Sequence, residues 1–122
     1  MISVRQTPDS NIVEVEITDS ITAQEFDDAL AALKEAIGQH GHIRVLELVG
    51  ELDTPPIPWN RFWADIKFGF EHLSDITHAA VVADQGWIAT YVNMLNPLFK
   101  AEFKPFKHAE LAAARAWLEQ AA

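Results

Sequence analysis

Apolar and polar residues alternate along the first part of the chain. Apolar residues fill every second position in Ile2–Val4 and again in Val13–Ile17, and the cluster Pro-Asp-Ser-Asn at 8–11 separates the two stretches. A period of two is typical of a strand with one face in water. Pro, Asp, Ser and Asn each favour turns. The pattern therefore predicts an N-terminal β-hairpin.

A helical period begins at Thr22. Thr22 and Glu25 have the spacing of a capping box, in which the two side chains satisfy free backbone N–H groups reciprocally. Ile21 stands where a hydrophobic staple would pack, and Gly38 or Gly41 can end the helix in a left-handed turn. The apolar stripe of this helix consists of Phe26, Leu30, Leu33 and Ile37.

Two nearly continuous apolar runs, 42–49 and 76–83, indicate strands covered on both faces, and Gly50 is expected to open a loop over 50–58. We expect the two strands to be neighbours at the sheet centre. Three other segments alternate with them, namely helices over 59–70 and 87–95 and a strand over 100–106, before a terminal helix over 111–118. The order ββαβαβαβα predicts a mostly parallel sheet. The expected core includes Leu30, Leu33, Val45, Val81 and Leu118.

Composition narrows the class of protein. The 122 residues include 9 Lys+Arg and 18 Asp+Glu, a formal net charge of −9, which argues against nucleic-acid binding. The absence of cysteine excludes disulfides and thiolate metal sites and is compatible with a reducing compartment. No apolar run approaches the roughly 20 residues of a membrane span, and the N-terminus lacks the features of a secretory signal. We expect a cytoplasmic protein.

Two motifs lie within this order of elements: A-V-V-x-D-x-x-W at 80–87 and A-x-x-W-L at 114–118. Together with the hairpin and the tryptophan-containing segment 58–76, they resemble the SpoIIAA-like group of small bacterial proteins, within the wider STAS and CRAL-TRIO-related superfamily. The resemblance implies a single-domain α/β fold of SpoIIAA-like (STAS) type over residues 1–122, with an N-terminal hairpin and packed helices. It does not supply an activity.

The resemblance raises one regulatory expectation. STAS-type anti-sigma-factor antagonists carry a phosphorylatable Ser or Thr at the start of the helix after the central strand. The matching stretch here is 51–59, where Thr54 after Asp53 is the nearest equivalent. Three prolines follow it, and the usual Ser-Gly context is absent. The sequence favours Thr54 as a turn residue over a phospho-switch.

Motifs for catalysis and for metal binding are missing. The chain has no Gly-x-Ser-x-Gly elbow and no glycine-rich phosphate loop. His40 and His42 are two imidazoles without a third ligand at metal-site spacing. We therefore expect no enzyme activity, no metal and no cofactor.

The aromatic residues provide the best indication of function. Trp59, Phe62 and Trp63 fall on one predicted helix, and Trp87 and Tyr91, four residues apart, fall on the next. One helical stripe cannot bury all the aromatic residues of the first helix equally. They form either a thick core or the walls of an apolar binding site.

Two acidic residues follow the carboxyl ends of the predicted central strands, where open α/β sheets tend to bind ligands. Asp53 or Asp84 would then mark the polar rim of the site, although an N-cap is the commoner role for Asp84. The lysines of segment 97–108 fit an edge strand better than contact with anionic lipid.

The sequence thus favours a non-catalytic binding module for a hydrophobic small molecule or lipid. The alternative is a STAS-type regulatory domain that docks a protein partner through the loop and helix after Val49. The sequence leaves open whether the protein forms a homodimer.

Overall fold

The computed structural model describes residues 1–19, 22–52, 75–84, 86 and 101–121, and within them the N-terminal alternation forms the predicted hairpin. Strand β1 (Ile2–Gln6) pairs antiparallel with β2 (Ile12–Asp19), so that Val4 faces Val15. In the turn, Asp9 adopts a positive φ of 57°, a conformation that short polar side chains tolerate better than most.

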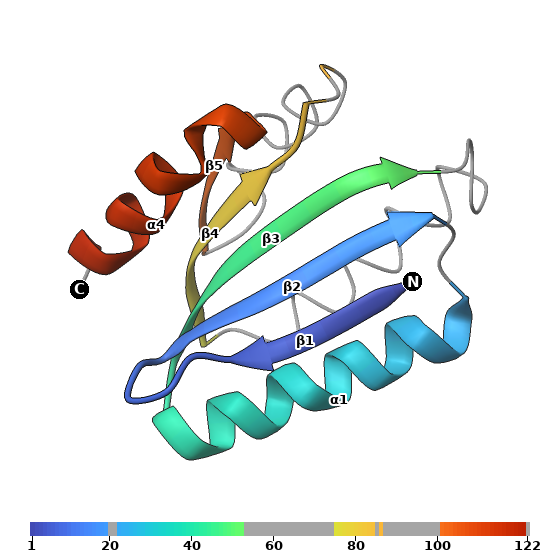
Figure 1. Cartoon of the computed structure of the whole chain (residues 1–122). Helices are drawn as coiled ribbons and strands as arrows, with labels where there is room; N and C mark the ends of the chain where they lie inside the picture. Colours follow the sequence, from blue (N-terminus) through green and yellow to red (C-terminus); the bar gives the residue numbers. More distant parts are fainter. Residues whose placement is uncertain (20–21, 53–74, 85, 87–100, 122) are drawn as a thin grey trace.

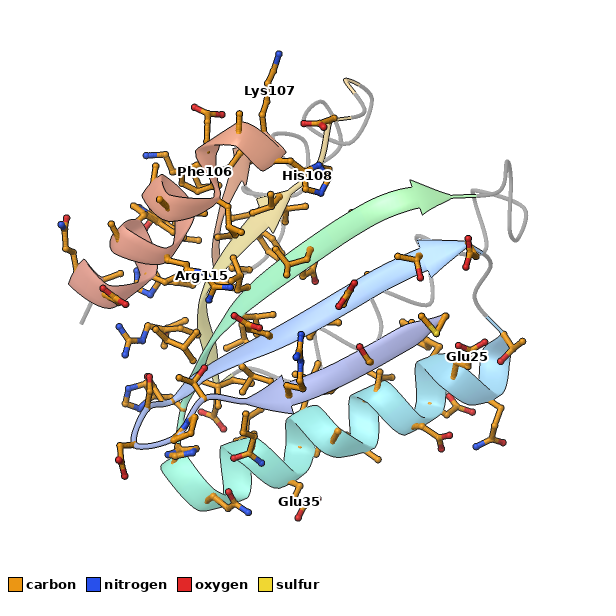
Figure 2. All side chains as sticks on the ribbon, in the orientation of Figure 1. Glu25, Glu35, Phe106, Lys107, His108 and Arg115 are labelled. Carbon is orange, nitrogen blue, oxygen red and sulfur yellow. The ribbon has the colours of Figure 1, made fainter. Side chains whose placement is uncertain are left out.

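Helix α1 (Ala23–His40) begins and ends where the sequence predicts. The Thr22 Oγ1 accepts from the Glu25 N–H at 3.1 Å, and the Glu25 carboxylate accepts from the Thr22 N–H at 3.3 Å. Gly41 ends the helix with a φ of +82° and donates its N–H to the Ile37 carbonyl at 2.7 Å. Glu25 also accepts from the Ile2 N–H at 3.0 Å, which holds the start of the helix against β1 (Figure 2).

Three parallel strands complete the sheet, β3 (Ile43–Leu52), β4 (Ile76–Val82) and β5 (Glu102–Phe106). The strand order is β1-β2-β3-β4-β5, and every pairing after the hairpin is parallel (Figure 1). The prediction that the third and fourth strands are neighbours inside the sheet is therefore confirmed. The helices predicted over 59–70 and 87–95 lie outside the described residues.

Strand β3 runs further than the sequence predicts. Gly50 was expected to open a loop, but it belongs to the strand, which continues to Leu52. A Cβ atom at Gly50 would stand 2.8 Å from the Thr18 Cγ2 of the neighbouring strand. The glycine therefore serves a close side-chain approach across the sheet rather than a turn.

Two helices cover opposite faces of the sheet (Figure 1). Helix α1 packs Leu33 and Ala36 on the face that holds Val45, whereas helix α4 (Leu111–Gln120), preceded by the short helix η2 (His108–Glu110), packs on the face that holds Leu46. Of the predicted core residues, Leu33, Val45, Val81 and Leu118 are buried, and Leu30 is half-buried against the core.

The partly buried side chain of Arg44 forms hydrogen bonds that join three segments distant in the sequence. The Arg44 guanidinium donates to the Asn11 Oδ1, with Nε at 2.8 Å and Nη2 at 2.6 Å. It also donates to the carbonyl oxygens of Leu118 and Ala121 at the end of α4. Carbonyl groups in the last turn of a helix lack partners within the helix, so Arg44 fixes the end of α4 to the start of β3.

Candidate functional site

The α1 face of the sheet carries a continuous buried apolar layer, which we name the α1-side layer. Strands β2 to β5 all contribute to it, and α1 covers part of it. Alternate residues of a strand point to opposite faces, so Val45, Glu47 and Val49 of the central strand share this side. The buried members of the layer include Val13, Val15, Leu33, Ala36, Ile43, Val45, Val49, Ile76, Ala79, Val81 and Phe103.

Glu47 interrupts this layer near its centre. In the sheet register it lies between Val15 of β2 and Val81 of β4, and along its own strand it lies between Val45 and Val49. All four valines are buried, with exposed fractions of 5% or less. Glu47 itself is half-buried. A carboxyl group on the central strand thus lies among four valines, two on the same strand and one on each neighbouring strand.

The surroundings of Glu47 disfavour its charged form. Burial raises the pKa of the Glu47 carboxyl to about 7, because an apolar environment solvates the ionised group poorly. No described residue donates a hydrogen bond or forms an ion pair with it. Among the described residues, the buried side-chain oxygen that lacks a hydrogen-bond partner is the Thr18 Oγ1. The Glu47 carboxyl is therefore held in apolar surroundings without a partner among the described residues.

Glu47 is not among the functional residues that the sequence predicts. The run 42–49 is nearly continuous and apolar, and Glu47 is its single acidic residue. The signal was present, because a strand buried on both faces has no water-facing side on which to place a carboxylate. Glu47 is two residues from both Val45 and Val49, so the alternation of side chains along a strand places all three on the same apolar face.

A second polar pair lies at the carboxyl edge of the parallel strands. Asp84, just after β4, accepts from the His108 N–H at 3.0 Å, and its other oxygen lies 3.0 Å from the His108 Nδ1. Figure 2 shows His108 where β5 gives way to η2. Both side chains are exposed. The pair joins the end of β4 to the first turn that leads into α4.

The contacts with His108 shift the titration of Asp84. The backbone hydrogen bond from His108, followed by the bond from its ring, holds the pKa of the Asp84 carboxyl below its usual range. A lowered pKa in the folded state stabilises the fold above the ordinary pKa of the group, and this contribution disappears as the pH falls through the lowered value. Protonation of Asp84 should therefore weaken the link between β4 and η2 in acid.

We expect Asp84→Ala to loosen the start of η2 without unfolding the protein. The His108 N–H would lose its acceptor, so its hydrogen exchange, measured by NMR near neutral pH, should accelerate about threefold to tenfold, as expected for one lost hydrogen bond. Asp28→Ala is the matched control, because Asp28 is exposed on α1 and bonds Gln24. Unchanged exchange at His108 would show that the bond does not persist in solution.

Asp84 is the one predicted site residue that the structure describes, and its described hydrogen bonds go to η2. The helix that it was expected to cap lies largely outside the described residues. The other predicted site residues, Asp53, Thr54, Trp59, Phe62, Trp63, Trp87 and Tyr91, also lie outside them.

The basic and aromatic segment forms the last strand of the described sheet. In β5, Phe103 is buried and Lys104 is exposed, as the edge-strand interpretation predicts. The Lys104 Nζ lies 5.5 Å from the ring centre of Phe106 and 5.8 Å from that of Trp117. Cation–π contacts of this kind fix the lysine over the α4 face.

The described residues contain neither a candidate metal site nor a candidate membrane-spanning helix. Across residues that the structure describes, no three or more acidic or histidine side chains gather as a metal site would require. None of the described helices is both long enough and apolar enough to pass through a membrane.

Comparisons with known proteins bear on the whole arrangement. The family model described as SpoIIAA-like matches residues 12–119. A crystal structure of an uncharacterised protein with a SpoIIAA-like fold from Shewanella loihica PV-4 is similar, with a TM-score of 0.67 and 19% sequence identity. The similarity covers 97% of this chain and 92% of that one, and at this identity it concerns the fold. A search of curated proteins found no match.

Proposed function

The chain belongs to the SpoIIAA-like family, and from that premise we propose that it is a non-catalytic binding domain for a small, mainly apolar molecule held against the α1-side layer. The observation that carries the proposal is the position of Glu47 among four buried valines. Small-molecule sites are mostly apolar, with a few polar groups that orient the ligand. Glu47 in the α1-side layer supports both parts of that description.

The cost of Glu47 to the fold supports the proposal as well. A polar group placed in apolar surroundings without a hydrogen bond lowers stability, and an ionised group lowers it further. A leucine of similar size would fill the same position without that cost. Residues that lower the stability of a fold are concentrated at functional sites. A ligand group that donates a hydrogen bond would supply the partner that the described residues do not give to the Glu47 carboxyl.

A lipid belongs among the ligands to test. The likeness of the sequence to CRAL-TRIO-related proteins remains the reason for including it. Docking of a protein partner through the segment after Val49 also remains a prediction from the sequence, because Thr54 and the rest of 53–74 lie outside the described residues.

Methyl NMR with dodecanol as the probe tests the proposal. Neighbouring residues of β3 provide an internal control, since Val45 lies on the α1 face and Leu46 on the α4 face. We expect saturable shifts of the Val15, Val45 and Val81 methyl signals and little change at Leu46. Native mass spectrometry of the purified protein should show a bound mass that denaturation releases.

The contrary results are equally specific. Shifts confined to Leu46 and Leu118 would place binding on the α4 face and refute the site. An absence of saturable shifts with dodecanol, together with a bare protein mass, would refute the function.

A further inference from the structure

We infer that Glu47 selects ligands that present a positive charge, such as the ammonium group of an amphipathic amine, to the centre of the α1-side layer. The inference rests on the proposed function and adds the chemical class of the ligand. It stands on the position of the carboxyl group, on the apolar groups around it and on the engagement of the described arginines elsewhere.

Glu47 lies between apolar residues of the neighbouring strands. Its cross-strand neighbours are Val15 and Val81, and the residues that α1 buries on this face are Ala29, Leu33 and Ala36. None of these side chains can donate a hydrogen bond or carry a charge. The cross-strand neighbours of Glu47 and the side chains that α1 buries on this face are therefore all apolar.

The described arginines all interact with groups other than Glu47. Arg115 and Arg5 both pair with Glu14, which alternates with the α1-facing Val13 and Val15 and so lies on the opposite face. Arg44 donates to Asn11 and to the end of α4. Every arginine in the described part of the chain is thus engaged away from Glu47.

The described lysines are all exposed. Lys104 lies over the Phe106 and Trp117 rings on the α4 face. Lys34 and Lys107 are exposed, on α1 and after β5. Together with the arginines, these are the basic side chains that the structure describes apart from histidines.

The charge of the ionised Glu47 carboxyl would distinguish between ligands of opposite charge. A carboxylate accepts strong hydrogen bonds from an ammonium group, and charge-assisted bonds of this kind are roughly twice as strong as neutral ones. The same carboxylate repels the carboxylate of a fatty acid, and apolar walls strengthen that repulsion. One residue therefore both attracts amines and rejects acids, which is how specificity is commonly built.

The test compares three probes with the same twelve-carbon chain: dodecylammonium, dodecanol and dodecanoate. The two ionic probes are used below their micelle concentrations and dodecanol below its solubility limit. Binding is followed through the Val45 and Val81 methyl signals at about pH 8, where the Glu47 carboxyl is mainly ionised. Salt at about 0.15 M screens the general attraction of an acidic protein for cations. We expect dodecylammonium to bind the wild-type protein about tenfold to hundredfold more tightly than dodecanoate.

Two variants separate the role of Glu47 from that of net charge. Glu47→Gln keeps the size of the side chain and removes its charge, and it should reduce the preference for dodecylammonium to less than about threefold. Glu35→Gln removes the same charge from the outer side of α1, where Glu35 is exposed (Figure 2), and it should keep the full preference. Circular dichroism confirms that each variant is folded, and Glu47→Leu replaces Glu47→Gln if the latter is not.

The outcomes distinguish the inference from the function on which it rests. If all three probes shift the α1-face methyl signals equally, or if Glu47→Gln retains the preference, the inference is wrong and the binding function stands. If no probe shifts those signals, the binding function itself fails. A preference for dodecylammonium that both Glu47→Gln and Glu35→Gln reduce equally would also overturn the inference, because it would report net charge alone.

Discussion

Leu33→Ala should lower the free energy of unfolding by about 2–5 kcal/mol, the range for removing a buried leucine side chain from a core. Leu33 is 6% exposed and packs from α1 onto the α1-side layer. The loss combines the transfer free energy of the deleted groups with the cavity that remains. Urea denaturation followed by circular dichroism measures it.

Leu30→Ala provides the matched control on the same helix. Leu30 undergoes the same chemical change, but it is half-buried at the margin of the layer, so its loss should be clearly smaller. A loss below about 1 kcal/mol at Leu33, typical of surface positions, would show that α1 does not pack on the sheet as described.

Glu47→Leu should instead stabilise the protein, by about 3 kcal/mol more at pH 8 than at pH 4. The pKa of the Glu47 carboxyl rises from its ordinary 4.5 to about 7 in the fold because of burial. Between these two values the unfolded chain has released the proton while the folded protein retains it. Wild-type stability therefore falls as the pH rises through this window, and a leucine removes that loss.

Denaturant unfolding of both proteins at several pH values measures the difference. The titration of the other carboxyl groups is common to both and cancels. Glu35→Leu, the same change at an exposed position on α1, should give no comparable dependence on pH. Equal stability of Glu47→Leu and wild type at pH 8 would mean that the ionised carboxyl already has a partner.

Much of the fold could be predicted because the relevant signals are local. Helix α1 is specified by its capping box at Thr22 and Glu25 and by Gly41 at its end, and the structure shows both. The hairpin follows from alternation on either side of a turn cluster. The central position of β3 and β4 follows from the continuous apolar pattern that burial on both faces demands.

The candidate site could be predicted less well, because it depends on contacts across the sheet. Asp84 was recognised as a residue at a strand end, but its bond to His108, 24 residues later, required the pairing of β4 with β5. Gly50 resembles a turn residue in the sequence. Its proximity to Thr18 depends on the register between β2 and β3, which the sequence pattern does not show.

Glu47 shows most clearly the difference between what the sequence determines and what the tertiary structure decides. The sequence by itself determined that 42–49 forms a buried strand, because side-chain alternation and apolar content are properties of the strand alone. Only the tertiary structure decided that a carboxyl group would lie between Val15 and Val81. Strand register and helix packing choose the neighbours of a side chain, and those neighbours set its charge state and its capacity to bind.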